Sequence, residues 1–185
     1  FVIESIAYSS DEWKDYKIPM RYTTYEYYDV VMKEHANGFQ VELEKKPLTA
    51  PISHYPEEYD WPDRLYEDCW PDATAWGVLD ESGQLIACIE TTPEAWFGRL
   101  RIQELWVHED YRRQGIAHKL MAVAKEQAKT EKKRALVLET QSCNAGAIGF
   151  YRQEGFSLIG FDSCCYSNRD IEKKEVRIEL GILFD

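Results

Sequence analysis

The spacing of apolar and polar residues along this 185-residue chain predicts many short strands and a few helices. Residues 1–7 are predicted as the first strand. Residues 22–33 and 39–46 are predicted as the two arms of a hairpin, because Asn37-Gly38 between them is typical of tight β-turns. A helix over residues 24–36 is the alternative for the first arm.

Residues 47–71 contain five prolines and are predicted as loop with short helical pieces, one of them around residues 62–69. Apolar runs after this segment predict six further strands, at residues 74–79, 85–91, 100–107, 134–140, 156–166 and 175–183. A helix from Ile116 to about Ala128 has an apolar face of Ala117, Leu120, Met121, Ala124 and Ala128. Because this helix links two strands, residues 100–107 and 134–140 are expected to pair in parallel. A second helix follows Asn144, and a charged loop spans residues 167–174.

The segment LRIQELWVHEDYRRQGIA, residues 100–117, carries the clearest chemical signal. It leads from a strand through a charged turn into a helix, with Arg112, Gly115 and Ala117 spaced as R-x-x-G-x-A. A loop that delivers small residues to a helix start presents several backbone N–H groups and the positive end of the helix dipole. The segment therefore predicts a pyrophosphate-binding turn, with an ordinary exposed basic turn as the alternative.

A second segment, ALVLETQSCNAGAIGFYRQEGF at residues 135–156, makes the interpretation of the first segment more specific. Together they resemble the GNAT superfamily of acetyl-CoA-dependent N-acetyltransferases. The first family motif matches R-x-x-G-x-A, and alanine at position 117 replaces the glycine of many members. The second motif, N-x-x-A-x-x-F-Y-x-x-x-G-F, matches Asn144, Ala147, Phe150, Tyr151, Gly155 and Phe156.

The resemblance spans about residues 73–183 and implies an α/β (α+β) GNAT fold. That fold has a central, mixed, mostly antiparallel sheet with one parallel strand pair, flanked by helices. We expect one domain over residues 1–185, with residues 1–72 as a variable substrate-side part and residues 73–183 as the acetyl-CoA-binding core. The stretches LETQ, GIAHKL and GFSLIGFD are similar to the streptothricin acetyltransferase branch of the family. That similarity implies an amine acceptor such as the β-lysine amine of streptothricin.

The resemblance also implies which residues bind the coenzyme. The pyrophosphate is assigned to the backbone of residues 113–118, and the pantetheine arm lies along residues 105–107 like an added strand. The full set of implied coenzyme contacts is Leu105, Trp106, Val107, Arg112, Arg113, Gln114, Gly115, Ile116, Ala117, His118, Asn144 and Tyr151. Acetyl-CoA is the expected co-substrate, and no metal is expected.

Acetyl transfer to an amine needs an acid for the leaving thiolate and a base for the amine proton. Tyr151 matches the family tyrosine and is the candidate acid, with a packed core tyrosine as the alternative. Asn144 contacts the coenzyme arm or caps the following helix, and both roles are compatible. Glu104 and Glu139 are the candidate bases, and the sequence does not choose between them. Solvent-exposed strand-end acids are the alternative for both.

The composition narrows the class of partner. A net charge of −11 argues against nucleic acid and suits a small cationic amine. The five cysteines have no metal or disulfide spacing, and we expect reduced thiols and a cytoplasmic location. Neither a signal peptide nor a long apolar span is apparent, so no membrane partner is expected. The acidic and aromatic residues between His54 and Asp72 are interpreted as a substrate lid or a solvated surface.

We therefore expect an acetyl-CoA:amine N-acetyltransferase that works as a monomer or homodimer. An enzyme that acetylates protein N-termini or lysines is the first alternative. A non-catalytic acyl-CoA-binding regulatory module is the second.

Overall fold

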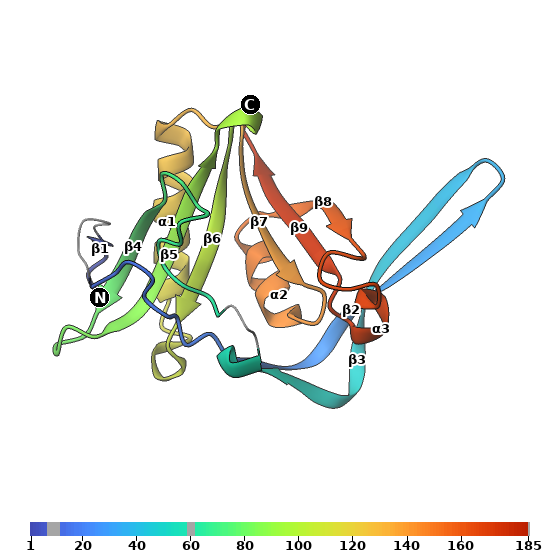
Figure 1. Cartoon of the computed structure of the whole chain (residues 1–185), viewed down its shortest axis with the longest axis horizontal. Coiled ribbons are helices and arrows are strands. Elements are labelled where there is room, and N and C mark those ends of the chain that lie inside the picture. The colour runs from blue at the N-terminus through green and yellow to red at the C-terminus, as the bar shows by residue number, and fades with distance from the viewer. Residues whose placement is uncertain (7–11, 59–61, 185) are drawn as a thin grey trace. The chain divides into compact units, whose positions relative to one another are not determined.

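The computed structural model describes residues 1–6, 12–58 and 62–184 (Figure 1). The chain divides into two compact units. The first unit comprises Phe1–Met20, Pro56–Leu138 and Gly181–Asp185, and the second comprises Arg21–Tyr55 and Glu139–Leu180. Strand β7 begins in the first unit and ends in the second.

The first unit is built on a sheet whose strand order is β1-β4-β5-β6-β7. Its strands are β1 (Glu4–Ile6), β4 (Thr74–Leu79), β5 (Leu85–Glu94), β6 (Arg99–Val107) and the start of β7 (Ala135–Gln141). Neighbours run antiparallel except β6 and β7, which pair in parallel. The predicted mixed, mostly antiparallel sheet with one parallel pair is confirmed. Short 3-10 turns lie at Pro56–Glu58, Ala95–Phe97 and Glu109–Tyr111.

Helix α1 (Ile116–Thr130) makes the connection between the parallel strands and packs against β5 and β6 (Figure 1). Its buried residues are Ile116, Leu120, Met121, Ala124 and Ala128. The predicted apolar face is confirmed, although Ala117 is only half-buried and Ile116 takes the buried place at the helix start. The 3.6-residue period was sufficient here because one helix face meets one sheet face.

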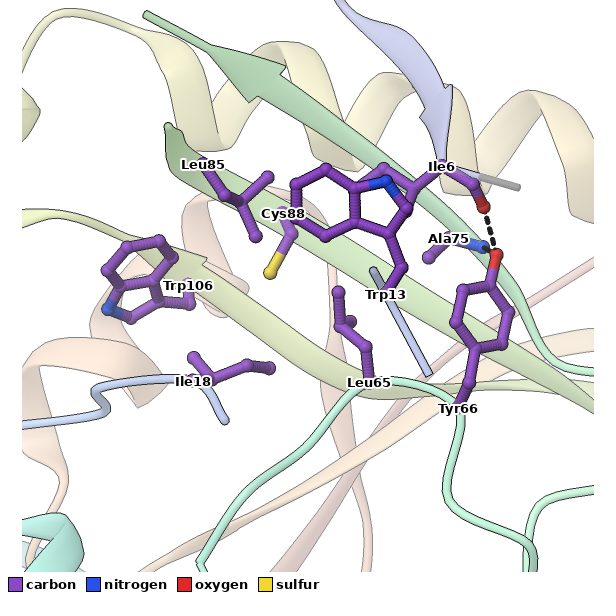
Figure 2. Close-up of a cluster of buried hydrophobic side chains, with 9 residues drawn as sticks. All are labelled: Ile6, Trp13, Ile18, Leu65, Tyr66, Ala75, Leu85, Cys88 and Trp106. Carbon is purple, nitrogen blue, oxygen red and sulfur yellow. Dashed lines mark hydrogen bonds between the residues drawn. The ribbon is translucent and has the colours of Figure 1, made fainter. Parts of the chain in front are cut away.

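Chain segments from before β4 cover part of this sheet and form a core cluster with it (Figure 2). Trp13, Ile18 and Leu65 pack there against Cys88 and Trp106. The Tyr66 hydroxyl donates to the carbonyl of Ile6 and accepts from the backbone N–H of Ala75 at 3.1 Å. The cluster therefore pins two non-helical segments to the sheet.

The helix predicted around residues 62–69 is wrong. Those residues form turns, and Tyr66 has a left-handed backbone with φ of 54°. Their backbone groups bond to a distant segment instead: the Leu65 N–H donates to the Tyr16 carbonyl at 3.0 Å, and the Asp15 N–H donates to the Leu65 carbonyl at 2.9 Å. Long-range pairing has replaced the local helical ladder.

The second unit contains a long hairpin of β2 (Tyr22–His35) and β3 (Gly38–His54), which appears as a two-stranded ribbon in Figure 1. The predicted hairpin is confirmed, and the alternative helix over residues 24–36 is wrong. The loop predicted for residues 47–71 is wrong for residues 47–54, because β3 continues through Pro47 and Pro51 to His54. After His54 the described residues form a 3-10 turn and irregular turns, as predicted. A two-stranded ribbon leaves one edge of each strand without a partner strand, where a missing N–H costs little.

The rest of the second unit contains α2 (Ala145–Gln153), β8 (Ser157–Asp162), α3 (Asp170–Lys173) and β9 (Arg177–Leu183). Strand β9 lies between β7 and β8. Strand β8 is shorter than predicted, because Asp162 accepts from the N–H of Cys164 at 2.9 Å and turns the chain. The predicted loop at residues 167–174 contains the short α3.

Candidate active site

The turn before α1 is shaped for close approach by a ligand. Arg113 and Gly115 both have left-handed backbones, with φ of 62° and 80°. A Cβ atom added at Gly115 would meet nothing within 4 Å apart from the adjoining residues of the chain, and residues 112–115 are exposed. The side chains of Arg112 and Gln114 bind back to the Val107 and Asp110 carbonyls at 3.0 and 3.3 Å. These hydrogen bonds fix the turn to the preceding strand and 3-10 turn, while residues 112–115 stay exposed.

The start of α1 adds backbone donors to this turn. The Gly115 carbonyl accepts the first helical bond, from the Lys119 N–H at 3.1 Å. The first N–H groups of an α-helix, such as those of Ile116 and Ala117 here, point out of the helix start and are not used by its own hydrogen-bond ladder. With the helix dipole they favour a negatively charged group at this end.

Strand β6 offers an open edge beside the same turn. Leu105, Trp106 and Val107 pair with β5 on one side, and Trp106 is buried between its half-buried neighbours. On the other side the parallel pairing with β7 covers residues 99–101 only. In the described part of the chain, residues 102–107 therefore have no strand partner on that side. Their backbone groups can pair with an extended ligand, as an added strand would.

Glu104 lies on the same strand and is half-buried. It is paired in register with Glu90 of β5. Burial raises the pKa of the Cys88 thiol, and the nearby carboxylates of Glu104 and Glu90 raise it further. Glu104 is thus directed to the sheet face that carries Cys88 and Trp106.

Glu90 is an acidic residue that the sequence analysis missed. It is fully buried, and its Oε2 accepts from the Tyr66 backbone N–H at 2.6 Å. Its Oε1 has no hydrogen-bond partner among the described residues. Burial raises the pKa of Glu90 to about 7, although the Tyr66 N–H opposes the change. The available signal was a glutamate directly after the apolar run LIACI.

Asn144 and Tyr151 belong to the second unit, at the start and near the end of α2. The Asn144 Oδ1 accepts from the Ala147 N–H at 3.3 Å, which confirms its helix-capping role. Tyr151 is half-buried, with its ring 5.6 Å from the ring of Phe150 and 5.9 Å from that of Phe156. These contacts describe the packing of the ring, and the role of Tyr151 as the acid stays a prediction.

Glu139, on β7, forms an ion pair with the Nη2 of Arg177. Arg177 also donates to the Glu179 Oε1 at 2.6 Å and to the Cys165 Sγ at 3.7 Å. Burial opposes the charge on Arg177, but Glu139 and Glu179 together raise its pKa above the usual value. A carboxylate held by a permanent cation is a weak proton acceptor.

The acidic segment proposed as a lid is divided between several environments. Glu57 and Glu58 are exposed on a 3-10 turn, whereas Leu65 and Tyr66 are buried in the core of Figure 2. Tyr59, Asp60 and Trp61 lie outside the described residues. Within the described ranges, no cluster of three or more histidine, cysteine or acidic side chains is arranged to hold a metal ion. No helix there is long and apolar enough to cross a membrane.

Comparison with known proteins identifies a family. The model of the acetyltransferase (GNAT) family matches residues 37–156. Streptothricin acetyltransferase of Streptomyces lavendulae is 33% identical over 95 residues, which are 51% of this chain and 50% of the relative. Streptothricin acetyltransferase A of Bacillus subtilis (strain 168) is 37% identical over 73 residues, 40% of this chain and 42% of the relative. The chain thus spans about half the length of the curated relatives that it matches.

Solved structures show the same fold. Nourseothricin acetyltransferase superposes with a TM-score of 0.75 at 23% identity, covering 98% of this chain and 97% of that one. A Bacillus anthracis str. Ames protein, assigned as a streptothricin acetyltransferase and solved in complex with acetyl coenzyme A, gives 0.72 at 22% identity. That match covers 100% of this chain and 97% of the neighbour. At these identities the likeness confirms the predicted GNAT fold and no more.

Proposed function

Because this chain belongs to the acetyltransferase (GNAT) family, we propose that it transfers an acetyl group from acetyl-CoA to a primary amine of a small cationic acceptor. One observation carries the proposal. The turn at residues 112–118 opens beside residues 102–107 of β6, which pair with β5 on one edge and have no strand partner among the described residues on the other. A pyrophosphate with an extended arm matches this pair of features.

The acetyl transfer needs a neutral amine, because an alkyl ammonium has no lone pair to attack the thioester. The amine nitrogen attacks the thioester carbon, its proton passes to a carboxylate, the C–S bond breaks and the thiolate takes a proton. We assign the carboxylate role to Glu104 rather than Glu139, because the Glu139 carboxylate is already engaged by the Arg177 guanidinium, which competes with a proton for it. We assign protonation of the thiolate to Tyr151, and contact with the coenzyme arm to Asn144.

The acceptor is proposed from charge and kinship. The chain carries a net charge of −11, which attracts cations. The matched relatives are streptothricin acetyltransferases, so a streptothricin-type antibiotic with a β-lysine amine is the first acceptor to test. All five cysteines are free thiols, which supports our proposal of a cytoplasmic location.

The coenzyme site can be tested with a matched pair of glycine variants. Gly115→Glu places a carboxylate where the pyrophosphate should bind. Gly83→Glu, in the turn between β4 and β5, imposes the same backbone strain, because Gly83 has φ of 85° and equally open surroundings. Calorimetric titration with coenzyme A should show roughly 100-fold weaker binding for the first variant only, since charge-assisted hydrogen bonds are lost. Equal affinities in the two folded variants would refute the assignment.

The acceptor class is decided by thiol release from acetyl-CoA with streptothricin, spermidine and a peptide with a free N-terminus. Turnover with streptothricin and spermidine supports the proposal. Turnover with the peptide alone replaces it with a protein acetyltransferase. Coenzyme binding without turnover on any amine replaces it with a non-catalytic acyl-CoA-binding module.

A further inference from the structure

The outer half of the hairpin in the second unit carries a row of apolar side chains on one face. Residues that lie opposite each other in two paired strands point to the same face of the ribbon. Three such pairs follow one another toward the tip: Val30 with Leu43, Met32 with Val41, and Glu34 with Phe39. We call the five apolar members of these pairs the apolar stripe. The intervening pairs point to the other face, and each contains a charged residue.

The inner end of the apolar stripe is covered and the outer end is exposed. Val30 is 4% exposed, whereas Met32, Val41 and Phe39 are 45%, 42% and 78% exposed. In Figure 1 the tip of the ribbon extends away from α2 and β8, which belong to the same unit. A two-stranded ribbon is marginally stable in water unless a face packs against something, and adjoining exposed apolar side chains mark an interaction surface. The outer end is therefore expected to be covered by a partner.

A groove opens on the same face of the ribbon, at the inner end of the apolar stripe. It has a volume of about 760 Å³ and lies between the hairpin and α2. Tyr28, Lys45 and the stripe residue Leu43 line it from the hairpin, and Ala145 and Gly149 line it from the helix. A Cβ atom added at Gly149 would meet nothing within 4 Å outside the adjoining chain. The helix side of the groove is thus built from small residues and has room for a large side chain.

The groove and the hairpin tip also carry opposite charges. Arg152, in the last turn of α2, lines the groove and is exposed, and its Nη1 donates to the neutral Tyr28 hydroxyl at 3.4 Å. Glu44, the acid at the groove, is placed by its register on the opposite face of the ribbon. At the tip Glu34 lies opposite Phe39, and both are exposed. Phe39 can therefore fill the groove of a second chain while Glu34 meets Arg152 of that chain.

The tip and the groove lie on one face of one ribbon, so two chains can satisfy both contacts at once. Two ribbons stacked face to face and running in opposite directions about a two-fold axis place each tip at the groove of the other. Leu43 at the groove and Phe39 at the tip are four residues apart, which is about 14 Å at roughly 3.4 Å per residue. The axis would pass midway between them, where Met32 and Val41 face the same residues of the second chain.

We propose that the apolar stripe is a homodimer interface, in which each hairpin tip docks in the groove between the hairpin and α2 of a second copy of this chain. A second copy fits better than a different protein, because one face of the chain supplies both halves of a self-complementary contact. The inference is independent of acetyl transfer, since it uses neither the turn before α1 nor the edge of β6.

Sedimentation equilibrium of the full chain over a range of concentrations tests the proposal. The wild-type chain should approach twice its mass of 21.7 kDa. Phe39→Ser should weaken the dimer about 100-fold or more, because it removes a buried ring from both halves of the interface. Trp96→Ser is the control: Trp96 is 93% exposed on the 3-10 turn at Ala95–Phe97, so the variant loses a larger exposed ring away from the hairpin and should keep the wild-type affinity.

A charge exchange tests the docking in the groove, and it also decides the matter if Phe39→Ser does not fold. Glu34→Arg and Arg152→Glu should each weaken the dimer about 10-fold, because each places like charges together, and the double variant should recover most of the loss. A wild-type chain that stays monomeric at every concentration overturns the proposal. So does a dimer that Phe39→Ser leaves unchanged, or a double variant with no recovery.

Discussion

Replacing Glu90 with glutamine should change how the stability of the chain depends on pH. Glu90 is fully buried on β5, and its pKa is raised from 4.5 to about 7, chiefly by burial. Between these values the folded chain holds a proton that the unfolded chain has released. The free energy of unfolding therefore falls as pH rises through this window, and the full penalty is present above pH 7.

The size of the effect follows from the two pKa values. At 1.36 kcal/mol for each pKa unit, the change from 4.5 to about 7 corresponds to roughly 3 kcal/mol. Glutamine keeps the acceptor for the Tyr66 N–H but places an N–H₂ where the Glu90 Oε1 has no partner. That cost, about 1–3 kcal/mol, is nearly independent of pH. The informative quantity is therefore the change with pH in the difference between variant and wild type.

Urea denaturation at pH 5 and pH 8 measures this change. Relative to wild type, Glu90→Gln should gain up to about 3 kcal/mol between the two pH values. Glu81→Gln, at an exposed position in the turn before β5, removes one negative charge without a buried site and serves as the control. If Glu90→Gln and wild type differ by the same amount at both pH values, Glu90 is ionised throughout and the reasoning is wrong.

Two predictions concern catalysis. Tyr151→Phe should lower kcat by roughly 10²- to 10⁴-fold with little effect on coenzyme A affinity, because the thiolate develops only in the transition state; steady-state kinetics and titration test this, and a near-normal kcat would make the tyrosine structural. Glu104→Gln should lower kcat over a similar range of roughly 10²- to 10⁴-fold, whereas Glu139→Gln, which breaks the half-exposed Arg177 pair, should mainly cost about 1 kcal/mol of stability in urea denaturation. The reverse order of the two kcat values would exchange the roles of the glutamates.

Local signals predicted the turn before α1 and the elements around it. The apolar face of α1, the cap at Asn144 and the Asn37-Gly38 turn each depend on neighbours within a few residues, so composition and spacing were sufficient. The parallel pairing of β6 and β7 followed from the intervening helix.

The errors fall where distant partners decide the conformation. Tyr66 is fixed by Glu90, 24 residues away, and by Ile6, 60 residues away. The sequence of residues 62–69 alone therefore does not predict its turn. Pro47 and Pro51 are strand breakers in a central strand but are tolerated in a two-stranded ribbon. Whether a proline breaks a strand depends on how many strands pair with it, and that number is set by the tertiary structure.

The same reasoning explains why a motif search finds the turn before α1 more readily than a contact between distant segments. That turn is one continuous segment, whose residues are recognisable by their order. The side-chain contacts at the base of the hairpin instead join Tyr22 to Gln141 and Cys143, which follow it by 119 and 121 residues. His54 comes from a stretch whose sequence is typical of a loop, because Pro47 and Pro51 lie within the strand that carries it and Pro56 follows that strand. Contacts of this kind are therefore to be sought at the ends of long-range strand pairs, where sequence order carries the least information about contact.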